Sequence, residues 1–199
     1  LLDRVNKGIL GLKPYEPGKP INETQKELGI KNIIKLASNE NPLGISPKAF
    51  KVISEKKDLN RYPDGNATSF KEVVSQIEKI KTSMITVGNG SNDLIEFVSK
   101  CFLSEGDNAI YSQHGFAIYP LAIKSTGAKA IKAKARDWGH DLNLMKDLVD
   151  ENTKVIFLAT PNNPTGTVLE SNVVEEFLDA IPSNICLLYT SPSPRDALE

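Results

Sequence analysis

Three loops carry the residues that could do chemistry in this sequence. The first, residues 88–93, reads GNGSND and lies between a predicted strand and a predicted helix. Its glycines allow a close backbone approach, and the N–H groups of Gly90, Ser91 and Asn92 at a helix N-terminus suit a phosphate. The alternative is a tight turn in which Ser91 or Asn92 is an ordinary helix cap. This loop by itself leaves both interpretations open.

The second loop, residues 112–119, reads SQHGFAIY and also follows a predicted strand. Phe116 and Tyr119 are three positions apart, so on a helix they share a face and can reach the same neighbourhood. An aromatic side chain there could stack on a planar ring. The alternative is that both are core residues and that His114 caps the helix.

The third loop, residues 159–166, reads ATPNNPTG and is the most specific of the three. Two prolines and a glycine constrain the backbone directly after a buried strand and present Asn162 and Asn163 at the end of that strand. A plain turn rarely needs all of these residues. The pattern therefore favours a ligand-binding loop.

Two common nucleotide-binding motifs do not fit the first loop. The third glycine position of a dinucleotide fingerprint holds Asp93, and Asp107, the candidate acidic residue, precedes the next strand instead of closing it. No Gly-Lys-Ser/Thr follows, which excludes a Walker loop.

The elements that must position these loops alternate between strands and helices from Met84 onward. This rhythm predicts an α/β fold with a largely parallel sheet and helices on both faces, whose ligands gather where the strands end. The predicted strands are 85–87, 109–111, 129–133, 155–159 and 185–188, and the predicted helices are 93–103, 116–125, 141–149 and 173–180.

The chain before the sheet is less regular. Residues 1–35 are rich in glycine and proline, which predicts an N-terminal arm or part of a small domain. Ser46-Pro47 predicts a helix start, with Ser46 as its N-cap. A second helix is predicted behind Thr68-Ser69, where apolar residues from Phe70 to Ile80 recur with helical spacing and indicate one packed face.

Composition excludes several classes of protein. The 199 residues carry 24 Lys+Arg and 25 Asp+Glu, a net charge of −1, which argues against a nucleic-acid partner. The apolar runs are far shorter than the roughly 20 residues that cross a bilayer, so no membrane association is predicted. Cys101 and Cys186 lack metal-ligand spacing and the N-terminus lacks a signal-peptide pattern, so we predict no metal site and a cytoplasmic location.

Together the three loops, in this order, resemble the fold-type-I pyridoxal-phosphate aminotransferases, and most closely their histidinol-phosphate branch. Three further motifs carry the resemblance: KPYEPGKP at 13–20, SNENPLG at 38–44 and NRYPDG at 60–65. It extends from about residue 1 to about residue 185. Six motifs in the family's order make the assignment specific.

The resemblance implies a cofactor, pyridoxal 5'-phosphate, and roles for particular residues. The glycine-rich loop with Gly90 would hold the cofactor phosphate through the backbone N–H groups of Ser91 and Asn92. Phe116 would stack on the pyridine ring, and Asn163 would donate a hydrogen bond to the ring oxygen.

The resemblance also implies a homodimer, because each site would combine residues from two chains. Tyr62 corresponds to the residue that reaches the partner subunit's cofactor phosphate, and Tyr15 to the tyrosine that contacts the substrate. The implied substrates are L-histidinol phosphate and 2-oxoglutarate.

The sequence departs from the family after residue 185. The Asp-Glu-Ala-Tyr that would follow the last strand is not found, nor is the Ser-x-x-Lys that supplies the Schiff-base lysine, so we assign no catalytic residue. Lys57 follows Ser54 at the right spacing, but it lies on a charged helix before the sheet and is expected to be solvated. Residues 186–199 resemble translated sequencing adapter and are predicted to be a foreign tail.

We therefore predict three segments: 1–35 as arm, 36–185 as a partial cofactor-binding large domain, and 186–199 as tail. The parent enzyme is predicted to transfer an amino group in histidine biosynthesis. The alternatives are that this chain is a non-catalytic fragment, or that the parent is an aromatic aminotransferase or a threonine-phosphate decarboxylase.

Overall fold

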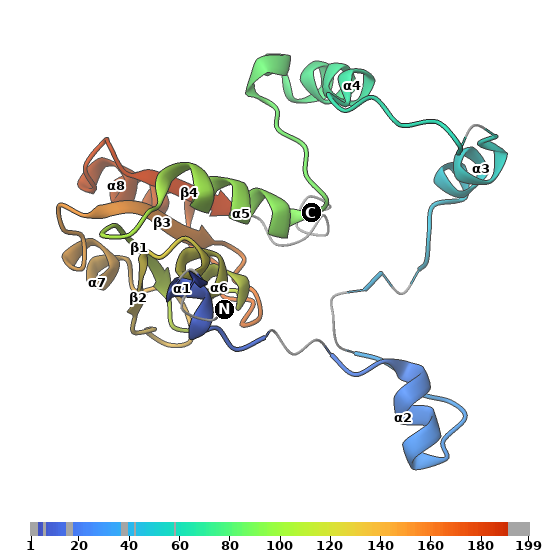
Figure 1. The fold of residues 1–199 in the computed structure, drawn as a ribbon, viewed down its shortest axis with the longest axis horizontal. Coiled ribbons are helices and arrows are strands. Elements are labelled where there is room, and N and C mark those ends of the chain that lie inside the picture. Colours follow the sequence, from blue (N-terminus) through green and yellow to red (C-terminus); the bar gives the residue numbers. More distant parts are fainter. Residues whose placement is uncertain are drawn as a thin grey trace. The chain divides into compact units, whose positions relative to one another are not determined.

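A computed structural model describes residues 4–5, 7–14, 18–36, 40–41, 43–57 and 59–190 (Figure 1). The chain divides into two compact units, one formed by residues 1–15 with 88–199 and the other by residues 16–87. These boundaries differ from the segments 1–35, 36–185 and 186–199, which remain a prediction from sequence.

The first unit, here called the sheet unit, contains a four-stranded parallel sheet in the order β2-β1-β3-β4. This confirms the predicted α/β class and every predicted strand from residue 109 onward. The strands are β1 (Asn108–Ser112), β2 (Lys129–Ala133), β3 (Thr153–Ala159) and β4 (Cys186–Thr190). The helices between and before them are α5 (Ser91–Phe102), α6 (Ile118–Ser125), α7 (Leu142–Asp147) and α8 (Ser171–Ala180).

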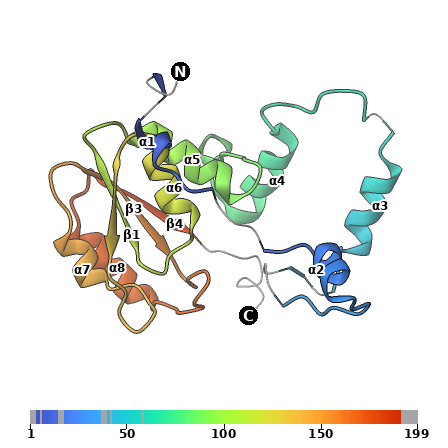
Figure 2. The same ribbon diagram turned by 60° about the horizontal axis from the view of Figure 1, so that its bottom comes forward.

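Helices cover both faces of this sheet, as its near-continuous apolar strands require (Figure 2). Alternate residues of β3 point to opposite faces, so Phe157 packs with α5 and α6 while Ile156 packs with α7 and α8. On the first face the buried residues include Ile95, Ala109, Tyr119, Ile123 and Val155. On the second they include Ile110, Ala133, Met145, Phe177 and Ile181.

A polar network joins β1 to β3 where both strands begin. The Asn108 side-chain amide donates to the Asp150 carboxylate at 2.7 Å, and the Thr153 hydroxyl donates to the Asn108 side-chain oxygen Oδ1 at 2.8 Å. The hydrogen bond from Asn108, followed by others, holds the pKa of Asp150 below its ordinary value of 3.8. Side-chain hydrogen bonds thus close the end of the sheet where these strands begin, and the candidate ligand-binding loops lie at the other end.

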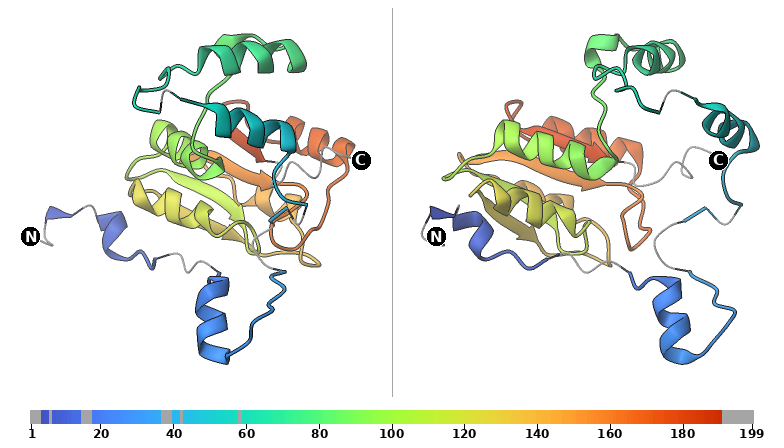
Figure 3. Two further views of the ribbon diagram at one scale, coloured as in Figure 1. Left: turned by 90° about the vertical axis from the view of Figure 1, so that its right-hand side faces the viewer. Right: turned by 45° about the vertical axis from the view of Figure 1, so that its right-hand side comes forward.

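Part of the predicted N-terminal arm is packed. Helix α1 (Lys7–Leu10) lies against α6 (Figure 3). A Cβ at Gly8 would overlap the Lys124 carbonyl oxygen, so the close approach requires glycine.

The second unit, here called the helical unit, contains α2 (Ile21–Leu28), α3 (Pro47–Glu55), α4 (Thr68–Glu78) and a 3₁₀ turn (Thr82–Met84). Helices α3 and α4 confirm the two predictions from sequence. Helix α2 lies in the region that we predicted to be a turn-rich arm.

The capping of these helices differs from the prediction. Ser46 precedes α3 as predicted, but its side chain makes no cap hydrogen bond. At α4 the Asp64 carboxylate accepts from the backbone N–H groups of Asn66 and Thr68. Hydrogen bonds, first from the Thr68 side chain, lower the pKa of Asp64 from 3.8 to about 2.

Two predictions for this region are wrong. The apolar stripe of α4 is not packed, because Phe70, Val73 and Ile77 are each more than half exposed. Ile85 to Val87 form no strand. A strand exists only through hydrogen bonds to a neighbour, and none of the described residues pairs with this segment.

The residues predicted to begin a foreign tail take part in the sheet. Strand β4 pairs with β3 in parallel, with Cys186 opposite Val155 and Tyr189 opposite Leu158. Residues 191–199, the remainder of the predicted tail, lie outside the described residues. Within the described ranges, every helix is too short or too polar to cross a membrane.

We expect a Phe→Ala substitution to cost much more stability in the sheet unit than in the helical unit. Phe157→Ala should lower the free energy of unfolding of the sheet unit by about 3–5 kcal/mol, because Phe157 is fully buried. Phe70→Ala, the matched control, should change stability by less than about 0.5 kcal/mol, because Phe70 is 57% exposed. The measurement is the urea dependence of amide hydrogen exchange in β1 and β3. Equal losses in both variants would contradict this description of the core.

Candidate functional site

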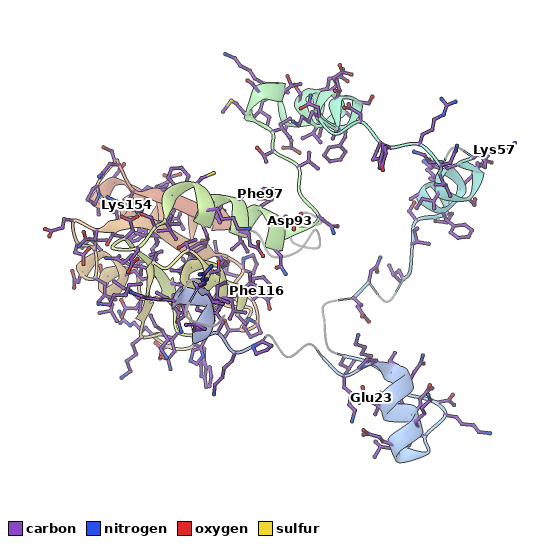
Figure 4. All side chains as sticks on the ribbon, in the orientation of Figure 1. Glu23, Lys57, Asp93, Phe97, Phe116 and Lys154 are labelled. Carbon is purple, nitrogen blue, oxygen red and sulfur yellow. The ribbon has the colours of Figure 1, made fainter. Side chains whose placement is uncertain are left out.

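The loops singled out in the sequence lie at one end of the sheet unit. Asp93, in the first turn of α5, and Phe116, after β1, lie at the same end, whereas Lys154, near the start of β3, lies at the other (Figure 4). Since β1 and β3 are parallel neighbours, the loops that follow them lie at the same end of the sheet, where the strands have their carboxyl ends. This is the end at which open parallel sheets bind ligands.

The N-terminus of α5 is built as an anion site would be. Gly90 is the N-cap, with a φ of 81° that a residue with a side chain rarely adopts, and it has no side chain that could make a cap hydrogen bond. Ser91 and Asn92 are therefore the first helical residues, and both are exposed. The alternative that Ser91 or Asn92 caps the helix is wrong. Their backbone N–H groups lie at the positive end of the helix dipole.

The turn before α5 is fixed by two short contacts. The Asn89 N–H donates to the Asp93 carboxylate at 2.8 Å, and the Gly90 N–H donates to the Gly88 carbonyl oxygen at 2.9 Å. A Cβ at Gly88 would lie 2.9 Å from the Cβ of Asp93. Gly90 thus contributes its backbone conformation, and Ser91 and Asn92 contribute the N–H donors.

The two aromatic residues of the second loop have different environments. Tyr119 is 1% exposed and stacks on Phe157, with ring centroids 4.8 Å apart, so it is a core residue. Phe116 is half-buried and meets Tyr119 edge to face at 5.9 Å. Of the pair, Phe116 is the ring that a ligand can reach.

His114 is a contact residue rather than a cap. Its imidazole lies 4.9 Å from the indole of Trp138, centroid to centroid. Trp138 is in the tight turn after β2, where Asp137 and Trp138 both have positive φ and Arg136 bridges to Gly139. Gly139 in turn lies against Thr167, because a Cβ there would be 3.3 Å from the threonine hydroxyl. The loops after β1, β2 and β3 are thus in mutual contact.

The third loop is closed by its own hydrogen bonds. The Asn162 N–H donates to the Thr167 carbonyl oxygen at 2.8 Å, and the Gly166 N–H donates to the Asn162 carbonyl oxygen at 2.7 Å. The Leu169 N–H donates to the Thr160 hydroxyl at 2.7 Å. Asn162 is buried and Asn163 is half-buried, so Asn163 is the more accessible of the two asparagines.

His140 belongs to this region and was not singled out in the sequence. Its Nε2 donates to the Ala159 carbonyl oxygen, the last of β3, at 2.7 Å, and the residue is 8% exposed. Burial lowers the pKa of His140 from 6.5, against the smaller opposite effect of the Ala159 hydrogen bond. The sequence does not mark this histidine as part of the site, because its hydrogen-bond partner is a backbone atom 19 positions away.

Three other residues named in the sequence analysis are not part of the described sheet unit. Tyr62 is fully exposed and belongs to the helical unit. Tyr15 lies outside the described residues. Lys57 is exposed, as predicted for a solvated lysine.

A hollow of about 410 Å³ is lined by residues of α7 and α8 and by His140. Its lining mixes both charges, including Arg136, Lys146, Asp141 and Glu176. Since it contains none of the predicted ligand contacts, it is not the candidate site. Within the described ranges, no group of three metal-binding side chains is close enough to hold an ion.

The residues present fit a flat, phosphorylated cofactor. An uncapped helix N-terminus suits the phosphate, an accessible aromatic ring suits the face of a heterocycle, and an accessible carboxamide suits a ring oxygen. Gly88 and Gly90 carry no side chain, so the turn before α5 would present backbone to a phosphate, and a Cβ at Gly90 would meet no atom within 4 Å.

Comparison with known proteins gives one family. The model of the aminotransferase class I and II family matches residues 31–190. A histidinol-phosphate aminotransferase of Idiomarina loihiensis is 46% identical over 188 residues, which are 94% of this chain and 51% of that protein. One from Mannheimia succiniciproducens is 48% identical over 92% of this chain and 50% of that protein. The chain thus spans about half the length of the curated relatives it matches.

Solved structures share the fold. The crystal structure of histidinol-phosphate aminotransferase from Sinorhizobium meliloti in complex with pyridoxal 5'-phosphate superposes with a TM-score of 0.83. It is 21% identical and covers 94% of this chain and 50% of that one.

The buried His140 predicts a pH dependence of stability. Its pKa is lower in the folded chain than the ordinary 6.5, so the unfolded state binds the proton more readily. Its contribution to stability is therefore fully present above about pH 6.5 and is lost as the pH falls through the folded-state pKa.

In His140→Gln, the side chain can still donate to Ala159 but does not titrate, so this loss should disappear. The measurement is urea unfolding at pH 7.5 and 5.5, a range above the one in which Asp64 and Asp150, with pKa values below 3.8, become protonated. The same pH dependence in wild type and variant would show that another group is responsible.

Proposed function

This chain belongs to the class I and II aminotransferases, and from that premise we propose that it is part of an enzyme that transfers an amino group between L-histidinol phosphate and 2-oxoglutarate. The relatives named histidinol-phosphate aminotransferase, at 44–48% identity, support the choice of substrate. The reaction would belong to histidine biosynthesis in the cytoplasm, where the two free cysteines would stay reduced.

The observation that carries the proposal is the placement of three contacts at one end of the sheet unit. The uncapped N-terminus of α5 and the loops after β1 and β3 lie there together (Figure 4). A phosphate and a ring can then be held at once, which a single loop would not achieve.

Pyridoxal 5'-phosphate, when bound, supplies a ring that withdraws electrons from the substrate's reacting carbon. The residues of this chain bind and orient that ring. The N–H groups of Ser91 and Asn92 would hold the phosphate, Phe116 would cover one face of the ring, and Asn163 would donate to the ring oxygen.

The remaining functional groups are proposed to come from outside these three loops. Tyr62 is fully exposed and is available to a second subunit, so we propose a homodimer in which it reaches the partner's phosphate. Tyr15 is proposed to contact the substrate. The lysine that attaches the cofactor is proposed to lie in a C-terminal half, to which residues 1–185 would be joined.

The proposal is tested by amino transfer in an enzyme that joins residues 1–185 to the C-terminal half of a histidinol-phosphate aminotransferase. We expect kcat/KM for L-histidinol phosphate to exceed that for phenylalanine or threonine phosphate by at least about 100-fold, because a site that binds polar groups rejects ligands that lack them. The 199-residue chain alone should transfer no amino group. A preference for phenylalanine would place the parent among the aromatic aminotransferases.

The two ring contacts should respond differently in the same joined enzyme. Phe116→Leu should weaken cofactor retention, through loss of a stacking contact worth about 0.5–1.5 kcal/mol, and leave the cofactor's pH-dependent absorbance in place. Asn163→Ala should move that absorbance change to higher pH, because the lost donor stabilises the ring oxygen's negative charge by about 1.5–3 kcal/mol.

The measurement for both variants is a spectrophotometric pH titration. If the Asn163 variant titrates like wild type while the Phe116 variant shifts, the roles assigned to these two residues are wrong.

A further inference from the structure

We infer that Asn162 is a positioning residue that sets the spacing between Phe116 and Asn163. Its side-chain amide ties the loop after β1 to the loop after β3, so that the contact with the ring's face and the contact with its edge are held in one arrangement. The inference rests on the proposed function, which gives that spacing its purpose.

Both N–H bonds of the Asn162 carboxamide are used. One donates to the His114 carbonyl oxygen at 3.0 Å, across 48 positions of sequence, and the other donates to the Thr165 hydroxyl at 2.7 Å. Asn162 is 2% exposed, so these bonds are shielded from water. A carbonyl oxygen can only accept, which fixes the amide nitrogen on the His114 side.

The residue is also held at its own backbone. Its N–H and carbonyl groups bond to Thr167 and Gly166 within the same loop, and the Thr165 and Thr167 hydroxyls lie 3.1 Å apart. The loop after β3, which includes Asn163, is therefore closed by its own hydrogen bonds. The amide bond to His114 connects this loop to the loop after β1.

Fixing His114 also fixes Phe116. Gly115, the residue between them, donates its N–H to the Ser112 carbonyl oxygen at 2.9 Å, and a Cβ there would lie 3.1 Å from that oxygen. The turn is tight, so a shift of the His114 carbonyl is passed on to the Phe116 ring. That ring is already oriented by its edge contact with Tyr119.

The donor bonds, rather than the carboxamide oxygen, carry this role. The buried Asn162 Oδ1 has no hydrogen-bond partner among the described residues. Asn162→Asp keeps the size of the side chain but, when ionised, cannot donate and places a negative charge beside the His114 carbonyl oxygen. Asn162→Ala removes the same donors and leaves a small space. Asn172→Ala, which removes an exposed carboxamide from α8, is the matched control.

The first experiment measures amide hydrogen exchange in the 199-residue chain without cofactor. In Asn162→Asp and Asn162→Ala the amides of Gly115 and Tyr119 should exchange about tenfold faster, because the loop after β1 has lost its tie. The β1 and β3 amides at Ile110 and Ile156 should keep their wild-type rates, as should all four amides in the Asn172→Ala control. Unchanged loop amides, or an equal rise at all four, would overturn the inference.

The second experiment measures pyridoxal 5'-phosphate retention in the joined enzyme described above. Asn162→Asp should lower the affinity about tenfold, although this side chain is itself too buried to be the ring contact. Faster loop exchange with unchanged affinity would overturn the positioning role. A wild-type joined enzyme that holds no cofactor would overturn the proposed function instead. The hydrogen-exchange result alone would then test whether Asn162 links the two loops.

Discussion

The parallel pairing of β1 with β3 is the constraint on which the sheet unit depends. Both strands are buried on both faces, so their backbone groups must find partners within the sheet, and apolar side chains must alternate between two helical layers. Asn108, Asp150 and Thr153 close the end where the strands begin. Because the two strands are parallel neighbours, the loops that follow them lie together at the other end.

The candidate site follows from this arrangement because its parts are far apart in the sequence. The N-terminus of α5 offers the N–H groups of its first turn, while Phe116 and Asn163 follow neighbouring strands at the same end of the sheet. Backbone atoms do much of the positioning: His140 donates to the Ala159 carbonyl oxygen, and Asn162 donates to that of His114. A rigid frame of this kind lowers the entropy lost when a flat ligand is bound.

In the helical unit, apolar residues with regular spacing are not packed against a sheet. The α4 stripe keeps its helical periodicity, yet Phe70 and Ile77 remain exposed, and residues 85–87 have strand-forming composition without a strand. Periodicity determines which face of a helix is apolar. It does not supply the surface against which that face is buried.

Local pattern by itself determined the α/β class, most element positions and the three loops, because apolar periodicity and turn residues are properties of adjacent positions. It left open whether Tyr119 was a ligand contact or a core residue, and it did not reveal His140 or the role of Asn162. Those depended on tertiary structure, since Tyr119 is buried by Phe157 and the two polar side chains bond to carbonyl oxygens of distant residues. A backbone carbonyl is the same at every position, so no residue type in the sequence marks it as a partner.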